Sequence, residues 1–116
     1  MVKETRDLVE VLHVDLTEAD AGFDVDVSIE DRLQNLLGRT TAENLREEID
    51  TLVRRVFIKI RPGDDLTHRV LTASAERDGG LVVEADPSNP RLSDAVAEVL
   101  SRAMGGREAV AEFVRR

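Results

Sequence analysis

The sequence contains no cysteine, tryptophan or tyrosine, and only three phenylalanines. Without cysteine, the chain can form no disulfide framework, thiolate nucleophile, zinc ribbon or iron–sulfur centre. With so few aromatic rings, aliphatic side chains must supply nearly all of the hydrophobic core. The length of 116 residues suffices for a single domain spanning 1–116, and so small a core predicts modest stability.

Lysine is almost as scarce, with two residues against fourteen arginines, and the 24 acidic residues give a formal net charge of -8. Duplex DNA binding depends on cations that neutralise phosphates, and here the arginines are interleaved with acids. The sequence therefore predicts no nucleic-acid partner. Arginine in place of lysine, together with many acids, is typical of a high-GC genome or a salt-adapted organism, and it specifies no function.

Long apolar runs are missing as well. The first residues include Lys3, Glu4, Arg6 and Asp7, so the start of the chain lacks the apolar segment of a signal peptide. No run of apolar residues approaches the length that crosses a bilayer. We expect a soluble, cytoplasmic protein with no membrane partner.

Apolar residues that alternate with polar ones predict a mostly antiparallel sheet. The clearest strand covers 23–28, where every second residue is apolar. Segment 8–16 is compatible with a helix or a strand, and its β-branched residues favour the strand. The turn residues 78–80 join two further strands into a hairpin. We expect strands at 8–16, 23–28, 56–61, 66–76 and 81–86.

The 3.6-residue period predicts two long amphipathic helices, at 42–56 and 90–104. Thr40 has the spacing to form a capping box with Glu43 before the first helix, and Asn89 is suited to cap the second. These helices cover one side of the sheet. The predicted fold class is therefore α+β, a two-layer arrangement of a mostly antiparallel sheet and amphipathic helices.

Two shorter helices are also predicted. Leu33, Leu36 and Leu37 share one helical face before Gly38 ends the first of them. The C-terminal segment 106–116 has a similar short amphipathic pattern, and its last residues are cations suited to the end of a helix. Both segments are too short to stay helical in water without packing on another element.

The sequence offers little support for catalytic or metal-binding chemistry. Asp64, Asp65 and His68 follow a Pro-Gly turn, but the chain has only two histidines and no zinc-ligand spacing. We interpret this cluster as a solvated turn, and His13 as a partly buried residue at the edge of the core. No serine has the context of a nucleophile. We predict no catalytic residue, cofactor or metal; the alternative is an enzyme half-site at the cluster, completed by a partner chain.

Four arginines are the candidates for a small-molecule site. Arg54 and Arg55 are adjacent, and Arg61 and Arg69 follow on predicted strands, so the four could clamp an anionic ligand across the sheet. The favoured interpretation is simpler. The arginines are then exposed and paired with nearby acids such as Glu47, and each pair contributes little to stability.

The segment 106–116 is the candidate for an interface. Val110, Phe113 and Val114 form an apolar stripe, and the glycine pair before the segment uncouples it from the preceding helix. The stripe is expected to dock on another subunit. The alternative is that it covers its own domain, as terminal helices often do.

After these exclusions, the function that the sequence favours is that of a non-enzymatic protein–protein interaction module. We expect a structural or adaptor subunit of a larger, virion-like or machine-like assembly. Its partners are other protein subunits, in a homo-oligomer or a hetero-oligomer. The alternative function is that of a small regulatory domain, which binds an anionic metabolite through the arginine cluster.

Overall fold

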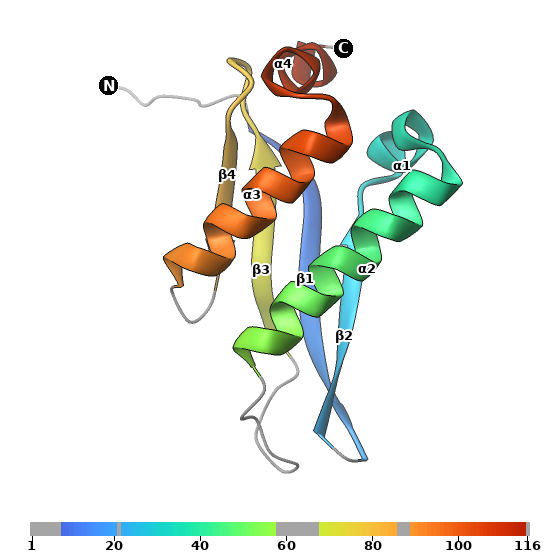
Figure 1. Cartoon of the computed structure of the whole chain (residues 1–116), viewed down its shortest axis with the longest axis vertical. Coiled ribbons are helices and arrows are strands. Elements are labelled where there is room, and N and C mark those ends of the chain that lie inside the picture. The colour runs from blue at the N-terminus through green and yellow to red at the C-terminus, as the bar shows by residue number, and fades with distance from the viewer. Residues whose placement is uncertain (1–7, 21, 58–67, 86–88, 116) are drawn as a thin grey trace.

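The computed structural model describes residues 8–20, 22–57, 68–85 and 89–115 (Figure 1). Strands and helices alternate in pairs along these residues. In chain order the elements are β1 (Val9–Ala19), β2 (Gly22–Ile29), α1 (Asp31–Leu37), α2 (Arg39–Val56), β3 (His68–Ala75), β4 (Leu81–Ala85), α3 (Pro90–Met104) and α4 (Arg107–Arg115). The predicted α+β class is confirmed.

The strands form one antiparallel sheet in the order β2-β1-β3-β4. Helices α2 and α3 lie across one face of this sheet, as Figure 1 shows. The uncertainty over residues 8–16 is resolved in favour of a strand, because β1 pairs with β2 on one side and with β3 on the other. The opposite face of the sheet carries polar side chains, and we call it the open face.

The covered face of the sheet meets α2 and α3 in an aliphatic core. Leu12, Val14 and Leu16 alternate along β1 and are at most 1% exposed. Ile49 of α2 and Leu100 of α3 belong to the same buried cluster. No polar or charged side chain is buried in the described part of the chain. Apolar packing therefore holds the two layers together.

The topology divides the fold into two similar halves. Each half is a hairpin followed by a long helix: β1, β2 and α2 form the first, and β3, β4 and α3 form the second. Exchanging β1 with β3 and β2 with β4 leaves the antiparallel order of the sheet unchanged. The central pair β1 and β3 joins the halves, and no repeat in the sequence accompanies this symmetry.

The prediction of a strand at 56–61 is wrong at its start. Val56 is the last residue of α2, and the backbone N–H of Phe57 donates to the carbonyl oxygen of Val53 at 3.1 Å. Val53 and Phe57 are 0% and 7% exposed, so they extend the buried face of the helix. This tertiary packing outweighs the strand propensity of the β-branched residues. Residues 58–61 of the prediction lie outside the described residues.

The long helices begin and end close to their predicted bounds. In α3, the side-chain oxygen of Asn89 accepts from the backbone N–H of Leu92 at 3.1 Å, which confirms the predicted cap. The predicted capping box at Thr40 is wrong, because α2 already begins at Arg39 and no side chain caps it.

Within the described ranges, no helix combines the length and the apolar composition that crossing a bilayer requires.

Candidate functional site

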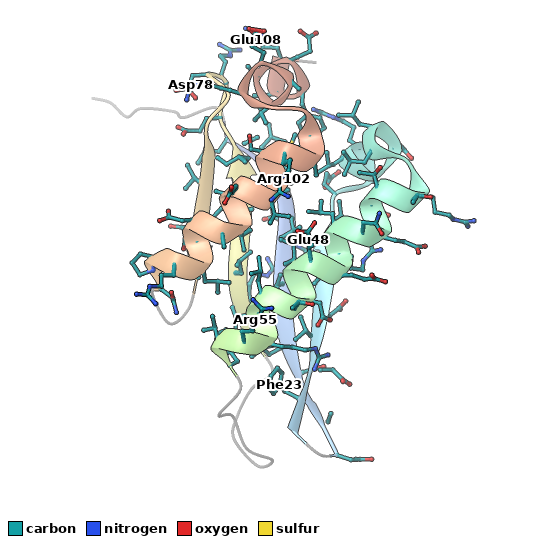
Figure 2. The ribbon with its side chains drawn as sticks, viewed as in Figure 1. Phe23, Glu48, Arg55, Asp78, Arg102 and Glu108 are labelled. Carbon is teal, nitrogen blue, oxygen red and sulfur yellow. The ribbon has the colours of Figure 1, made fainter. Side chains whose placement is uncertain are left out.

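A groove of about 740 Å³ runs between α2 and α3 on the outer side of the helical layer. Each helix packs its apolar stripe on the sheet, so the flanks of the two helices face each other above it. Helix α2 contributes Asn44, Glu47, Glu48, Thr51, Leu52 and Arg55, and α3 contributes Ala95, Glu98 and Val99. Figure 2 shows Glu48, Arg55 and Arg102 along the seam between the two helices.

The groove continues toward α1 and α4. A hollow of about 150 Å³ shares Glu48 and Val99 with the groove, and a further one of about 280 Å³ shares Thr41 and Ala103 with that hollow. The last hollow is also lined by Leu36, which is 46% exposed. Neighbouring hollows thus share lining residues, and we call this row of three hollows the interhelical groove. It follows α2 from Thr41 to Arg55, which lie about 21 Å apart along the helix axis.

The interhelical groove has an apolar floor and an acidic rim. Leu52, Val99 and Ala103 are half-buried or buried and line its floor. Its lining also includes four glutamates and two arginines, which leaves a surplus of negative charge. These ionisable residues are Glu47, Glu48, Glu98 and Glu112, with Arg55 and Arg102.

The lining of the interhelical groove combines several kinds of chemical group. The lining residues offer carboxylates, guanidinium groups, threonine hydroxyls and aliphatic surface. Within the described ranges, no group of three His, Cys, Asp or Glu side chains could hold a metal ion. A long groove with an apolar floor and charged rim has the form that protein interfaces use for an amphipathic segment.

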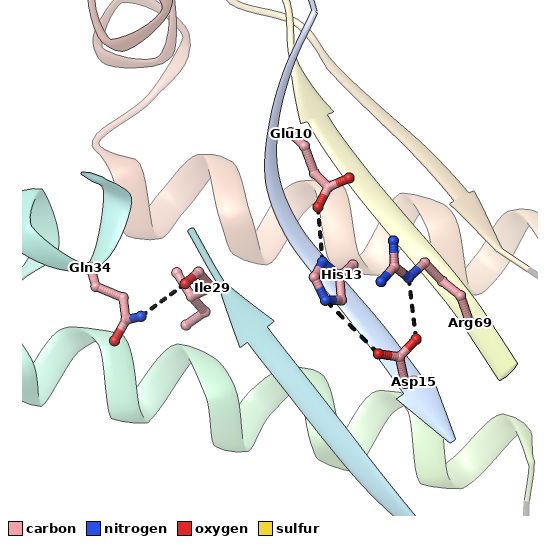
Figure 3. A network of polar contacts seen from close by, with 6 residues as sticks. All are labelled: Glu10, His13, Asp15, Ile29, Gln34 and Arg69. Carbon is pink, nitrogen blue, oxygen red and sulfur yellow. Dashed lines mark hydrogen bonds and ion pairs between the residues drawn. The ribbon is translucent and has the colours of Figure 1, made fainter. Parts of the chain in front are cut away.

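A chain of polar contacts runs along the open face of the sheet (Figure 3). His13 Nδ1 lies 2.8 Å from a carboxylate oxygen of Glu10, and His13 Nε2 lies 3.9 Å from Asp15. Arg69 on β3 donates to Asp15 at 3.2 Å. All four side chains are partly exposed, so they form a solvated network.

Comparison of the chain with protein-family models, with curated proteins and with solved structures found no match.

The four candidate arginines do not come together as an anion site. Arg54 and Arg55 lie on α2, which covers one face of the sheet, and both are exposed. Arg69 pairs with Asp15 on the opposite face. Arg61 lies outside the described residues. A clamp that combines Arg69 with the two arginines of α2 is therefore wrong, because the sheet separates them.

Most of the predicted solvated turn lies outside the described residues, including Asp64 and Asp65. The backbone of His68 begins β3, and its side chain belongs to the part of the chain that is left undescribed. The enzyme half-site that these residues would form with a partner chain stays untested.

The predicted interface stripe is used within the chain. Val110 is 0% exposed and Phe113 is 3% exposed, and both belong to the core cluster, whereas Val114 is half-buried at its edge. Arg32 of α1 donates to the carbonyl oxygen of Phe113 at 2.6 Å, and its guanidinium carbon lies 4.4 Å from the ring centre. The docking of this stripe on another subunit is therefore corrected to docking on the chain's own fold.

Sequence reasoning did not single out the interhelical groove. From the sequence, the charged residues of its rim belong to the polar faces of two amphipathic helices. Such faces are ordinarily exposed to solvent and carry no further function. The spacing of Ala95, Glu98 and Arg102 does mark one flank of α3, and that of Glu48 and Arg55 marks one flank of α2. Only the order of the strands brings these two flanks together.

The open face is strongly acidic, which makes the stability of the fold dependent on salt. Asp26 lies directly opposite Asp15 on the neighbouring strand, and Asp24 is exposed beside them. Such like charges repel, and potassium chloride shortens their range from about 10 Å at 0.1 M to about 3 Å at 1 M. We expect the melting temperature, followed by circular dichroism, to rise by a few degrees over this range. A steady fall would contradict the role assigned to acidic repulsion.

Proposed function

We propose that the protein is a non-enzymatic protein–protein interaction module, a structural or adaptor subunit of a larger assembly. The interhelical groove is its docking surface. The observation that carries the proposal is the row of neighbouring hollows between α2 and the end of α3, which extends from Arg55 to the exposed Leu36. A solvent-exposed groove with an apolar floor is a common feature of interaction surfaces.

The shape of the groove favours a helical segment as the occupant. The groove follows two antiparallel helices over about 21 Å, which matches about fourteen residues of a third helix. Apolar residues of that helix, spaced at i, i+3, i+4 and i+7, would lie on Leu52, Val99 and Ala103. Because the rim has four glutamates and two arginines, the flanks of the occupant should carry arginine or lysine.

A designed peptide tests this proposal. The probe is a fluorescein-labelled helical peptide of about fourteen residues, with leucines on one face and arginines on its flanks. We expect it to bind in the micromolar range by fluorescence anisotropy, and to bind more tightly than a peptide with glutamates in place of the arginines. Glu48→Lys, in the rim, should weaken binding about tenfold, which corresponds to about 1.4 kcal/mol.

The control is Glu43→Lys, on the same helix. Glu43 is exposed and lines a different hollow, so this change alters the net charge equally but leaves the groove intact. It should keep the affinity of the parent within about twofold, since the long-range attraction is the same for both variants. Equal weakening by the two variants would mean that the peptide binds only to the net negative charge, and the groove would lose its proposed role.

A second candidate function, binding of an anionic metabolite, has narrower support. A hollow of about 400 Å³ is lined by Phe23, Thr51, Arg54 and Arg55. Arg54 already donates to Asp50 at 2.5 Å, and its guanidinium carbon lies 5.7 Å from the Phe23 ring centre. Half of the positive charge is thus engaged within the chain. A gain in melting temperature with anionic metabolites, lost in Arg55→Ala, would favour this function over the first.

A further inference from the structure

The two edges of the sheet are protected to different degrees. At β2, the carbonyl oxygen of Val27 accepts from Arg46 at 3.2 Å, and that of Ile29 accepts from Gln34 at 2.8 Å. Figure 3 shows the second of these contacts, in which a side chain of α1 reaches the end of the strand. Backbone groups occupied in this way are less able to pair with another strand. Side chains from the helices therefore occupy part of this edge, near the end of β2.

The edge at β4 has a different chemical character. Leu81, Val82 and Val83 are a run of three apolar residues, each half-buried. Among the described residues, no side chain hydrogen bonds to the backbone of this strand. An apolar edge strand whose outward backbone groups have no partner among the described residues is a template for a further strand.

The helix above this edge is also suited to a close neighbour. Ser93, Ala97 and Ser101 are four residues apart on α3 and are half-buried. They lie on the flank opposite Ala95 and Glu98, which face the groove, and α3 packs on β4. This flank is uncharged and built of small residues, so a second helix can approach it without burying a charge.

We infer that β4 pairs with β4 of a second copy of the chain and extends the sheet to eight antiparallel strands. A two-fold axis at Val83 places Leu81 opposite Ala85 of the second copy, and Val82 opposite Glu84 of the second copy. This register keeps the covered faces of both copies on the same side. It uses a surface separate from the interhelical groove, so it is independent of the proposed function.

The charge distribution favours β4 over β2 as the pairing edge. Joining two copies through β2 would bring four aspartates, Asp24 and Asp26 of each copy, close together on one face. Joining them through β4 brings together only one carboxylate from each copy, that of Glu84. Salt screens the remaining repulsion, so the association should strengthen at high ionic strength.

Sedimentation velocity of the full chain tests the inference. At concentrations from about 1 to about 500 µM in 0.5 M KCl, we expect a reversible monomer–dimer equilibrium in the micromolar range. A five-residue strand and one helix flank bury less area than a standard-size interface, which accounts for the modest affinity. A chain that remains monomeric throughout this range would overturn the inference.

Charge substitutions at two residues test the register. Val82→Glu places a carboxylate opposite Glu84 of the other copy, and the two-fold axis repeats this repulsive contact. The change should weaken the dimer about tenfold. The double change Val82→Glu with Glu84→Lys turns both contacts into opposite-charge pairs, and should restore the dimer. Circular dichroism establishes that each variant is folded. Failure of the double variant to associate would disprove this pairing.

Two controls separate this surface from the rest of the molecule. Ser28→Glu adds the same charge to the open face at β2, and should leave the dimer unchanged. On α3, Ala97→Trp should hinder the dimer and spare peptide binding, whereas Ala95→Trp should fill the groove and spare the dimer. A dimer weakened equally by Ser28→Glu and Val82→Glu would mean that it does not form through β4.

Discussion

Phe113→Asp is expected to reduce the free energy of unfolding by about 4 kcal/mol or more. Removing a buried phenylalanine costs about 3–5 kcal/mol, and the new carboxylate must also be desolvated. Phe113 is 3% exposed, and its ring and carbonyl oxygen both contact Arg32. Because small proteins have only about 5–15 kcal/mol of stability, the variant should lose a large fraction of it and should unfold at a much lower urea concentration.

Urea denaturation followed by circular dichroism measures this loss. Val114→Asp provides the control, since Val114 lies next to Phe113 but is only half-buried. It should cost less than half as much, because its carboxylate can reach water. If Phe113→Asp instead left the stability intact and reduced the mass in solution, α4 would be an interface element after all.

Gly79→Ala is expected to cost about 2–4 kcal/mol, an unusually large effect for one added methyl group. Gly79 has φ +95°, a conformation that costs an alanine about 1–2 kcal/mol. In addition, the new Cβ would lie 2.6 Å from Cγ of Arg107 and still closer to the carbonyl oxygen of that residue. The added group would therefore push the β3–β4 turn away from the start of α4.

Gly106→Ala separates these two causes. Gly106 has φ +103°, close to that of Gly79, but a Cβ at Gly106 would meet no atom within 4 Å. This control should lose only the conformational part, about 1–2 kcal/mol. Equal losses of thermal or chemical stability in the two variants would contradict the close approach between the turn and α4.

Local patterns predict most of the elements of this fold. β2 was predictable because every second residue faces the core, and α3 because Asn89 caps it and its apolar residues recur every three to four positions. The prediction of a strand at 56–61 failed where the sequence is ambiguous. Val53, Val56 and Phe57 fit a helical face and also resemble the start of a β-branched strand, and only packing on the sheet decides between them.

The candidate site could not be predicted from the sequence in the same way. The interhelical groove exists because the strand order places α2 beside α3, and no local pattern encodes that order. Leu36 illustrates the same limit. It shares a predicted helical face with Leu33, yet Leu33 is 0% exposed and Leu36 is 46% exposed, because the seven residues of α1 cover little surface. Burial on a short helix depends on its neighbours.

The division into two hairpin-plus-helix halves determines how the fold can assemble. Each hairpin closes over a short turn, whereas the β1–β3 pair joins Val14 to Leu71, which are 57 positions apart (71 minus 14). The entropy lost in closing so long a loop must be offset by burial that only the joined sheet supplies. We therefore expect this central pairing to limit the rate of folding. Neither half can cover its inner strand alone, so the two halves must form in one cooperative step.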